Sequence, residues 1–343
     1  MTTNNKIQKI EALGQGPWAT KDPFLFCVHH KDDYPKGNDN FGPDKALLKG
    51  RNIGSDFDPR NGWRMYHGEG VPGFPYHPHR GFETVTVALE GVIDHADSLG
   101  AAGRFRDGDV QWMTAGKGVL HAETFPLLNK EADNPLELFQ IWLNLPAKNK
   151  FVEPHFRMLW SEDIPILKLK DSNDKTTKVR LIAGQLENDN APSPTPNSWA
   201  AEATNEVAIW SIEMDANATW TLPKASAGIN RTLYFYRGDN LKVEAQDIPN
   251  YHAVQLKSDE DIALQAGNES CFILVLQGKP IDEPVAQHGP FVMNTKAEIQ
   301  QAFMDYQQTQ FGGWDWKTPN PVHGRDYYRF AKHADGTLVE KKA

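Results

Sequence analysis

Two pairs of potential metal ligands stand out in the sequence, each with one residue between its members. His77 and His79 lie in the segment GFPYHPHRGFETVTVALEG, and His121 and Glu123 lie in GDVQWMTAGKGVLHAET. Residues two positions apart on a β-strand point to the same face, so each pair aims two side chains at one point. Three neutral imidazoles and one carboxylate suit a divalent first-row metal. One such pair alone also fits a surface or cross-strand contact, whereas two pairs favour a metal site.

The elements that must position these pairs are predicted to be strands. ETVTVALEG alternates threonine with apolar residues, as a half-buried strand does. Turn signals such as RDGD, AGKG and YRGD separate similar runs, which lie at 136–145, 206–214, 231–238 and 269–278. Many short strands with Gly and Pro punctuation predict antiparallel barrels or sandwiches, and therefore an all-β fold.

Two other segments differ from this pattern of short strands. The stretch 168–200 is polar and rich in Pro, Ser, Asn and Asp, which is typical of a linker or long loop with one short strand, KVRLIAG. NTKAEIQQAFMDYQQTQFGG predicts a helix near 295–310, with Thr295 and Glu298 at capping-box spacing and a Gly-Gly stop.

Composition narrows the possible functions. The chain of 343 residues has a net charge of −9 and no Lys/Arg cluster, which argues against direct binding to nucleic acid. We expect no secretory signal, because the first residues lack an apolar core, and no membrane span. Cys27 and Cys271 lie far apart and predict no disulfide framework, so a reducing cytoplasm is the expected location.

PGFPYHPHRGFETVTVALEG, DGDVQWMTAGKGVLHAE and QHGPFVMNTKAEIQQAF (287–303) together resemble the signature of the pirin family, within the cupin superfamily. The resemblance implies two cupin-type β-barrels with a few short helices, and one metal in the N-terminal barrel. We therefore predict a metal-binding barrel over 1–165, a linker over 166–200, a C-terminal barrel without metal over 201–318, and an extension over 319–343. The aromatic residues beyond 313 are expected to dock on the protein or on a second subunit.

Carried over residue by residue, the implied metal ligands are His77, His79, His121 and Glu123. General cupins use a glutamate placed as Glu83 is here, which leaves Glu83 as a rival ligand or as a partner that orients an imidazole. His95 is interpreted as an exposed strand residue or, alternatively, as part of the pocket lining. The apolar residues that flank the ligands in sequence could line a pocket or fill the core: Phe74, Tyr76, Phe82, Trp112 and Met113.

The resemblance implies iron(II) as the metal, with nickel, cobalt, manganese, copper or zinc as alternatives. It also leaves several functions open. A dioxygenase of the quercetin 2,3-dioxygenase type would bind a small aromatic enol and dioxygen, and Glu123, or else Glu83, would take the proton of the substrate hydroxyl. A non-catalytic regulator would sense metal redox state and bind a protein partner. A third possibility is a stress-related cupin that acts on another small molecule.

Overall fold

The computed structural model describes residues 6–341 and divides the chain into two compact units. Unit 1 contains the residues up to Cys27 together with Glu162–Asp282. Unit 2 contains Val28–Ser161 together with the residues from Glu283 onward. Within 6–341, no helix is long and apolar enough to cross a membrane.

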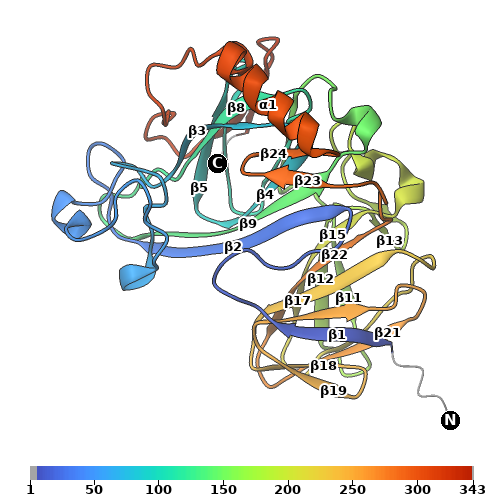
Figure 1. Cartoon of the computed structure of the whole chain (residues 1–343). Helices are drawn as coiled ribbons and strands as arrows, with labels where there is room; N and C mark the ends of the chain where they lie inside the picture. Colours follow the sequence, from blue (N-terminus) through green and yellow to red (C-terminus); the bar gives the residue numbers. More distant parts are fainter. Residues whose placement is uncertain (1–5, 342–343) are drawn as a thin grey trace. The chain divides into compact units, whose positions relative to one another are not determined.

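In unit 1 the described residues form a larger sheet of seven strands and a smaller sheet of four (Figure 1). In spatial order, the larger sheet contains β1 (Ile7–Ala12), β20 (His252–Leu256), β17 (Asn230–Arg237), β22 (Cys271–Gly278), β15 (Ala208–Met214), β12 (Thr176–Ala183) and β11 (Ile166–Lys170). The smaller sheet contains β16 (Thr219–Leu222), β21 (Ile262–Ala266), β18 (Asn240–Val243) and β19 (Gln246–Pro249). A short hairpin adds β13 (Gln185–Leu186) and β14 (Asp189–Asn190).

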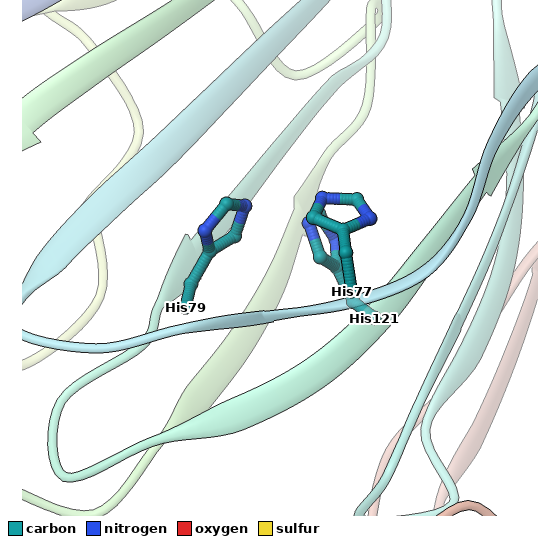
Figure 2. Close-up of side chains that lie close together, drawn as sticks. All are labelled: His77, His79 and His121. Atoms are coloured by element: carbon teal, nitrogen blue, oxygen red, sulfur yellow. The ribbon is translucent and has the colours of Figure 1, made fainter. Parts of the chain in front are cut away.

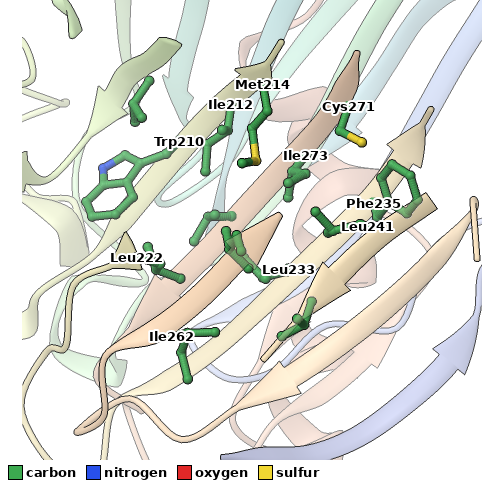
Figure 3. Close-up of a cluster of buried hydrophobic side chains, with 14 of the residues drawn as sticks. Trp210, Ile212, Met214, Leu222, Leu233, Phe235, Leu241, Ile262, Cys271 and Ile273 are labelled. Carbon is green, nitrogen blue, oxygen red and sulfur yellow. The ribbon is translucent and has the colours of Figure 1, made fainter. Parts of the chain in front are cut away.

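The core of unit 1 lies between these two sheets. Alternate residues of β17 and β22, such as Leu233, Phe235 and Ile273, are fully buried and pack against Leu241 and Ile262 of the smaller sheet (Figure 3). This alternation follows from the two-residue period of a strand, which sends every second side chain to the same face.

Unit 2 contains the histidine pairs and also has two main sheets among its described residues. The first contains β10 (His155–Leu159), β7 (Val110–Thr114), β4 (Phe82–Glu90), β9 (Asn134–Asn144) and β2 (Phe24–Tyr34). The second contains β26 (Leu338–Lys341), β25 (Arg329–Lys332), β6 (Ala102–Arg106), β5 (Val92–Asp97), β8 (Val119–Thr124) and β3 (Gly73–His79). A further hairpin contains β23 (Ala286–His288) and β24 (Phe291–Met293).

Helices are few, as predicted. In the described chain the one α-helix is α1 (Lys296–Thr309), which packs against β23 and β24 (Figure 1). Thr295 caps it and forms the predicted capping box with Glu298. The helix ends before the predicted Gly-Gly stop because Gln310 adopts a left-handed conformation. The remaining helical segments are short 3₁₀ turns at Lys45–Leu48, Arg60–Gly62, Ala147–Asn149, Trp199–Ala201, Ala203–Asn205 and Gln310–Gly312.

The two units do not follow the predicted boundaries at 165, 200 and 318. β1 pairs with β20, so the first described residues belong with the later barrel and not with the one predicted to bind a metal. The segment 166–200 contains the predicted strand KVRLIAG, which corresponds to β12, but it is not otherwise a linker, because β11 is a second strand of the larger sheet in unit 1. The residues from Glu283 onward return to unit 2, which therefore includes α1. Pairings between strands so distant in sequence leave no mark on local composition.

Candidate metal centre

Strands β3 and β8 bring the two histidine pairs together. The strands are antiparallel neighbours, and His77 lies directly opposite His121. His79 follows two residues after His77 and therefore shares its face. The ligand nitrogens of His77, His79 and His121 all lie within 4.8 Å of one another, so this group could hold a metal ion. Figure 2 shows the three rings gathered beside these strands.

The three histidine rings are in the neutral state that can bind a metal cation. Burial lowers the pKa of His77 to about 4 and the pKa values of His79 and His121 well below the ordinary value of 6.5. All three rings are therefore neutral at neutral pH, and a neutral ring offers one lone pair to a metal.

Backbone carbonyls set the tautomers of two of these rings. The Nδ1 atom of His77 lies 2.9 Å from the carbonyl oxygen of Pro75, and that of His79 lies 3.4 Å from the carbonyl oxygen of Pro290. A carbonyl only accepts, so each Nδ1 donates, and each Nε2 is left with its lone pair. Both ring nitrogens of His121 are buried without a hydrogen-bond partner among the described residues. A buried ring without partners is costly, and a metal ion would satisfy one of its nitrogens.

Glu123 lies on the same face of β8 as His121 but is anchored toward the opposite sheet. The hydroxyl of Thr86 donates to its Oε1 at 2.8 Å, and the amide of Gln140 donates to its Oε2. Burial raises the pKa of Glu123 above its ordinary value of 4.5. Its carboxylate is not part of the group within 4.8 Å, so its role as fourth ligand stays a prediction.

Glu83 lies on the other face of β4. Thr86 of that strand points toward Glu123, and the pairing of β4 with β7 is regular between residues 83 and 87, so Glu83 points away from the histidines. Its Oε1 accepts a hydrogen bond from the hydroxyl of Thr114 at 2.7 Å. The structure therefore does not support Glu83 as a ligand or as the partner of a ligand.

His95 is a neighbour of the centre, and its interpretation as an exposed strand residue is wrong. It is fully buried, lies directly opposite Glu123 on the adjacent strand β5, and its ring centroid is 5.6 Å from that of His121. The side chain of Gln111 lies 2.9 Å from its Nδ1, and Asp97 lies 3.5 Å from its Nε2. The sequence contains a signal for this placement, because His95 and Asp97 repeat the spacing of the two ligand pairs.

The apolar residues that flank the candidate ligands in sequence divide between two faces. Phe82 lies beside the centre, with its ring 4.9 Å from that of His79. Trp142 of β9 was not predicted, although its ring lies 5.3 Å from that of His79. Trp112 lies on the opposite face of its sheet, because its neighbour Gln111 points toward His95. Phe82 and Trp142 therefore give the centre an aromatic wall.

The described residues that follow α1 pack against the strands of Val28–Ser161 within unit 2, which agrees with the expectation that this tail docks on the protein itself. Trp314 stacks on Tyr76, the residue before His77, with ring centroids 4.9 Å apart. The indole of Trp316 donates to the carbonyl of Asp97 at 2.8 Å, and β25 extends the sheet by pairing with β6. The tail thus contacts β3, the strand that carries two of the three histidines, and also β5 and β6.

Two family models match this chain. The pirin family model matches residues 6–143, and the model described as the pirin C-terminal cupin domain matches residues 209–312. The chain belongs to the pirin family. The predicted membership, and the predicted fold with two cupin-type domains, are confirmed. The tail beyond residue 312 lies outside both matches.

Relatives of this pirin-family chain have two kinds of name. Human pirin is 36% identical over 248 residues, which cover 70% of this chain and 78% of the relative. A Vibrio cholerae protein that is provisionally named a quercetin 2,3-dioxygenase is 36% identical over 251 residues, which cover 70% and 80%. The crystal structure of a quercetin 2,3-dioxygenase from Acinetobacter baumannii has a TM-score of 0.68 and 26% identity, covering 90% of this chain and 96% of the other.

Proposed function

We propose that this protein is a metal-dependent dioxygenase of the quercetin 2,3-dioxygenase type, with its centre at His77, His79 and His121 and Glu123 as the fourth ligand. The observation that carries the proposal is the buried cluster of three neutral imidazoles, in which both nitrogens of His121 have no partner among the described residues. The names of the Vibrio and Acinetobacter proteins support the reaction type. Iron(II) and a cytoplasmic location are part of the proposal.

The side chains around the histidines suit an aromatic enol. Phe82 and Trp142 offer flat apolar surfaces beside His79, where a planar ring can stack. Glu123 would accept the proton of the substrate hydroxyl, because burial makes its carboxylate more basic than an exposed glutamate. Thr86 and Gln140 hold both oxygens of that carboxylate in place. A bound transition metal would supply Lewis acidity and one-electron chemistry toward dioxygen.

Oxygen consumption by iron-loaded protein over a panel of flavonols and simpler enols tests this proposal. We expect consumption with at least one flavonol, a dependence on added metal, and a rate that rises with pH as the carboxylate and the substrate hydroxyl ionise. The rate should vanish in His77→Ala and persist in His252→Ala, which changes a half-buried histidine of unit 1.

If metal-replete protein consumes no oxygen with any compound of the panel, the enzyme proposal is wrong. The alternative would then be a regulator that acts through a protein partner. Its first test would be whether oxidation of the bound metal changes binding to that partner.

The role of Glu123 can be tested separately from activity. Glu123→Gln removes the one anionic group of the proposed ligand set, so we expect the metal affinity to fall by more than about 100-fold. Replacing a residue that only hydrogen-bonds to a ligand typically costs less than this. Glu83→Gln is the matched control, because it changes a buried glutamate on the other face of β4, and we expect the affinity to stay within about tenfold of the wild type. Competition with a chromophoric chelator measures both. If Glu83→Gln loses the metal and Glu123→Gln keeps it, the proposed ligand set is wrong at this position.

A further inference from the structure

Unit 1 has a pocket of its own at one end of its barrel. The pocket has a volume of about 480 Å³ and lies where β15 and β17 begin and where β12 and β22 end. This volume falls within the range of about 300–1,000 Å³ that is usual for small-molecule sites. Much of the lining is apolar and includes Leu186, Val207, Trp210 and three prolines. The pocket is therefore large enough, and apolar enough, for a small organic ligand.

A buried arginine is fixed in the wall of this pocket. Arg231 is only 3% exposed and lies directly opposite Gln277 on the neighbouring strand. Its Nε donates to the Gln277 Oε1 at 2.7 Å, and the Gln277 Nε2 donates to the backbone carbonyl of Glu206 at 3.1 Å. Two residues further along β17, Leu233 belongs to the core. The guanidinium thus continues the interior face of the barrel and is held in one orientation.

Two hydrogen-bond donors of the pocket wall have no partner in the described part of the chain. They are Nη1 of Arg231 and Nε1 of Trp210, both of which are buried. No described carboxylate forms an ion pair with Arg231, although burial lowers its pKa only to about 10, so the group stays charged at neutral pH. Glu206 and Asp261 act on this charge from a greater distance than an ion pair. A buried N–H without an acceptor is costly, and a ligand oxygen that accepts from Nη1 would offset that cost.

We propose that this pocket binds a small organic monocarboxylate, with its carboxylate against Arg231 and the indole N–H of Trp210. The apolar wall would pack against the uncharged body of the ligand. Three glutamates also line the pocket: Glu187, Glu202 and Glu206. Glu187 and Glu202 are exposed, and the Oε2 of Glu206 already accepts from the backbone N–H of Ser226. Their charges disfavour a second negative group on the ligand.

Calorimetric titration with benzoate and with its neutral analogue benzamide tests the site. We expect benzoate to bind at least about tenfold more tightly than benzamide, because only benzoate accepts charge-assisted hydrogen bonds from Arg231. Arg231→Met should weaken benzoate binding by about 10- to 100-fold. Because a carboxylate could also bind a metal, the titration is repeated with His121→Ala, in which benzoate binding should persist.

Further variants keep the test decisive. Arg237→Met changes the arginine at the other end of β17 and should leave benzoate binding unchanged. If Arg231→Met does not fold, Trp210→Phe keeps an aromatic ring and loses the N–H, and should weaken benzoate by about 2- to 10-fold. The proposal is overturned if benzamide binds as tightly as benzoate, if inorganic phosphate does so, or if folded Arg231→Met binds benzoate like the wild type. Tight binding of terephthalate would contradict the restriction to monocarboxylates.

Discussion

Replacing His121 by alanine is expected to remove the metal from this protein while the fold survives. The wild type should carry close to one transition-metal ion per chain. His121→Ala should lower the metal affinity by more than about 100-fold, because it removes a proposed ligand and not a residue that only hydrogen-bonds to one. The barrel should survive because a large cluster of buried apolar side chains stabilises unit 2. Elemental analysis of dialysed protein measures the metal, and circular dichroism measures the fold.

The matched control for this experiment is His252→Ala. His252 is a half-buried histidine on β20 in unit 1, and its Nδ1 lies 3.0 Å from the carbonyl oxygen of Asn250. We expect full metal content in this variant. Full occupancy in His121→Ala, or two ions per wild-type chain, would show that the centre has been assigned to the wrong residues.

The second large effect is expected at Arg104, which connects the tail to the sheet that carries the three histidines. Its guanidinium is fully buried and binds both carboxylate oxygens of Asp94, at 2.6 and 2.7 Å. It also donates to the backbone carbonyls of Gly324 and Asp326 in the tail. Arg104→Ala leaves the Asp94 charge buried without its partner, so we expect a loss of about 3–5 kcal/mol in the free energy of unfolding of unit 2.

Urea denaturation followed by a probe in unit 2 measures that loss, and Arg106→Ala is its control. Arg106 lies on the same strand and pairs with the exposed carboxylate of Asp107, so its removal should cost less than about 1 kcal/mol. Limited trypsin digestion should also cut the tail faster in Arg104→Ala, since two of the contacts that hold it are lost. If the two variants unfold alike, the buried pair does not secure the tail.

The candidate metal centre illustrates what local sequence can predict. His77 and His79, like His121 and Glu123, are two residues apart, and in strands this spacing alone places them on one face. The same period predicted β4, β9, β15, β17 and β22 close to their observed bounds. The capping residues of α1 were predictable for a similar reason, because a capping box depends on residues only three positions apart.

Residues that act across sheets were less predictable. The position of Glu83 depends on the face that β4 turns toward β8. The strand is buried on both faces, so its alternation of Thr and Val does not show which face that is. His95 has the right spacing to Asp97, but only the pairing of β5 with β8 places it beside Glu123. Trp142 lies on β9, distant in sequence from the histidines, and reaches His79 only through the folded barrel.

By itself, the sequence determined the all-β class and the grouping of His77, His79 and His121, because each of these depends on spacings of a few residues, and its three motif blocks resembled the pirin family. Tertiary structure decided which segments share a unit, since β1 pairs with β20 and β25 pairs with β6 across more than 200 residues. It also decided that Arg231 and Trp210 share the lining of one pocket, because they lie on different strands of one sheet. The physical reason is the same in each case. A strand's own period sets which side chains share its face, whereas the choice of its neighbours depends on burying apolar surface contributed by distant parts of the chain.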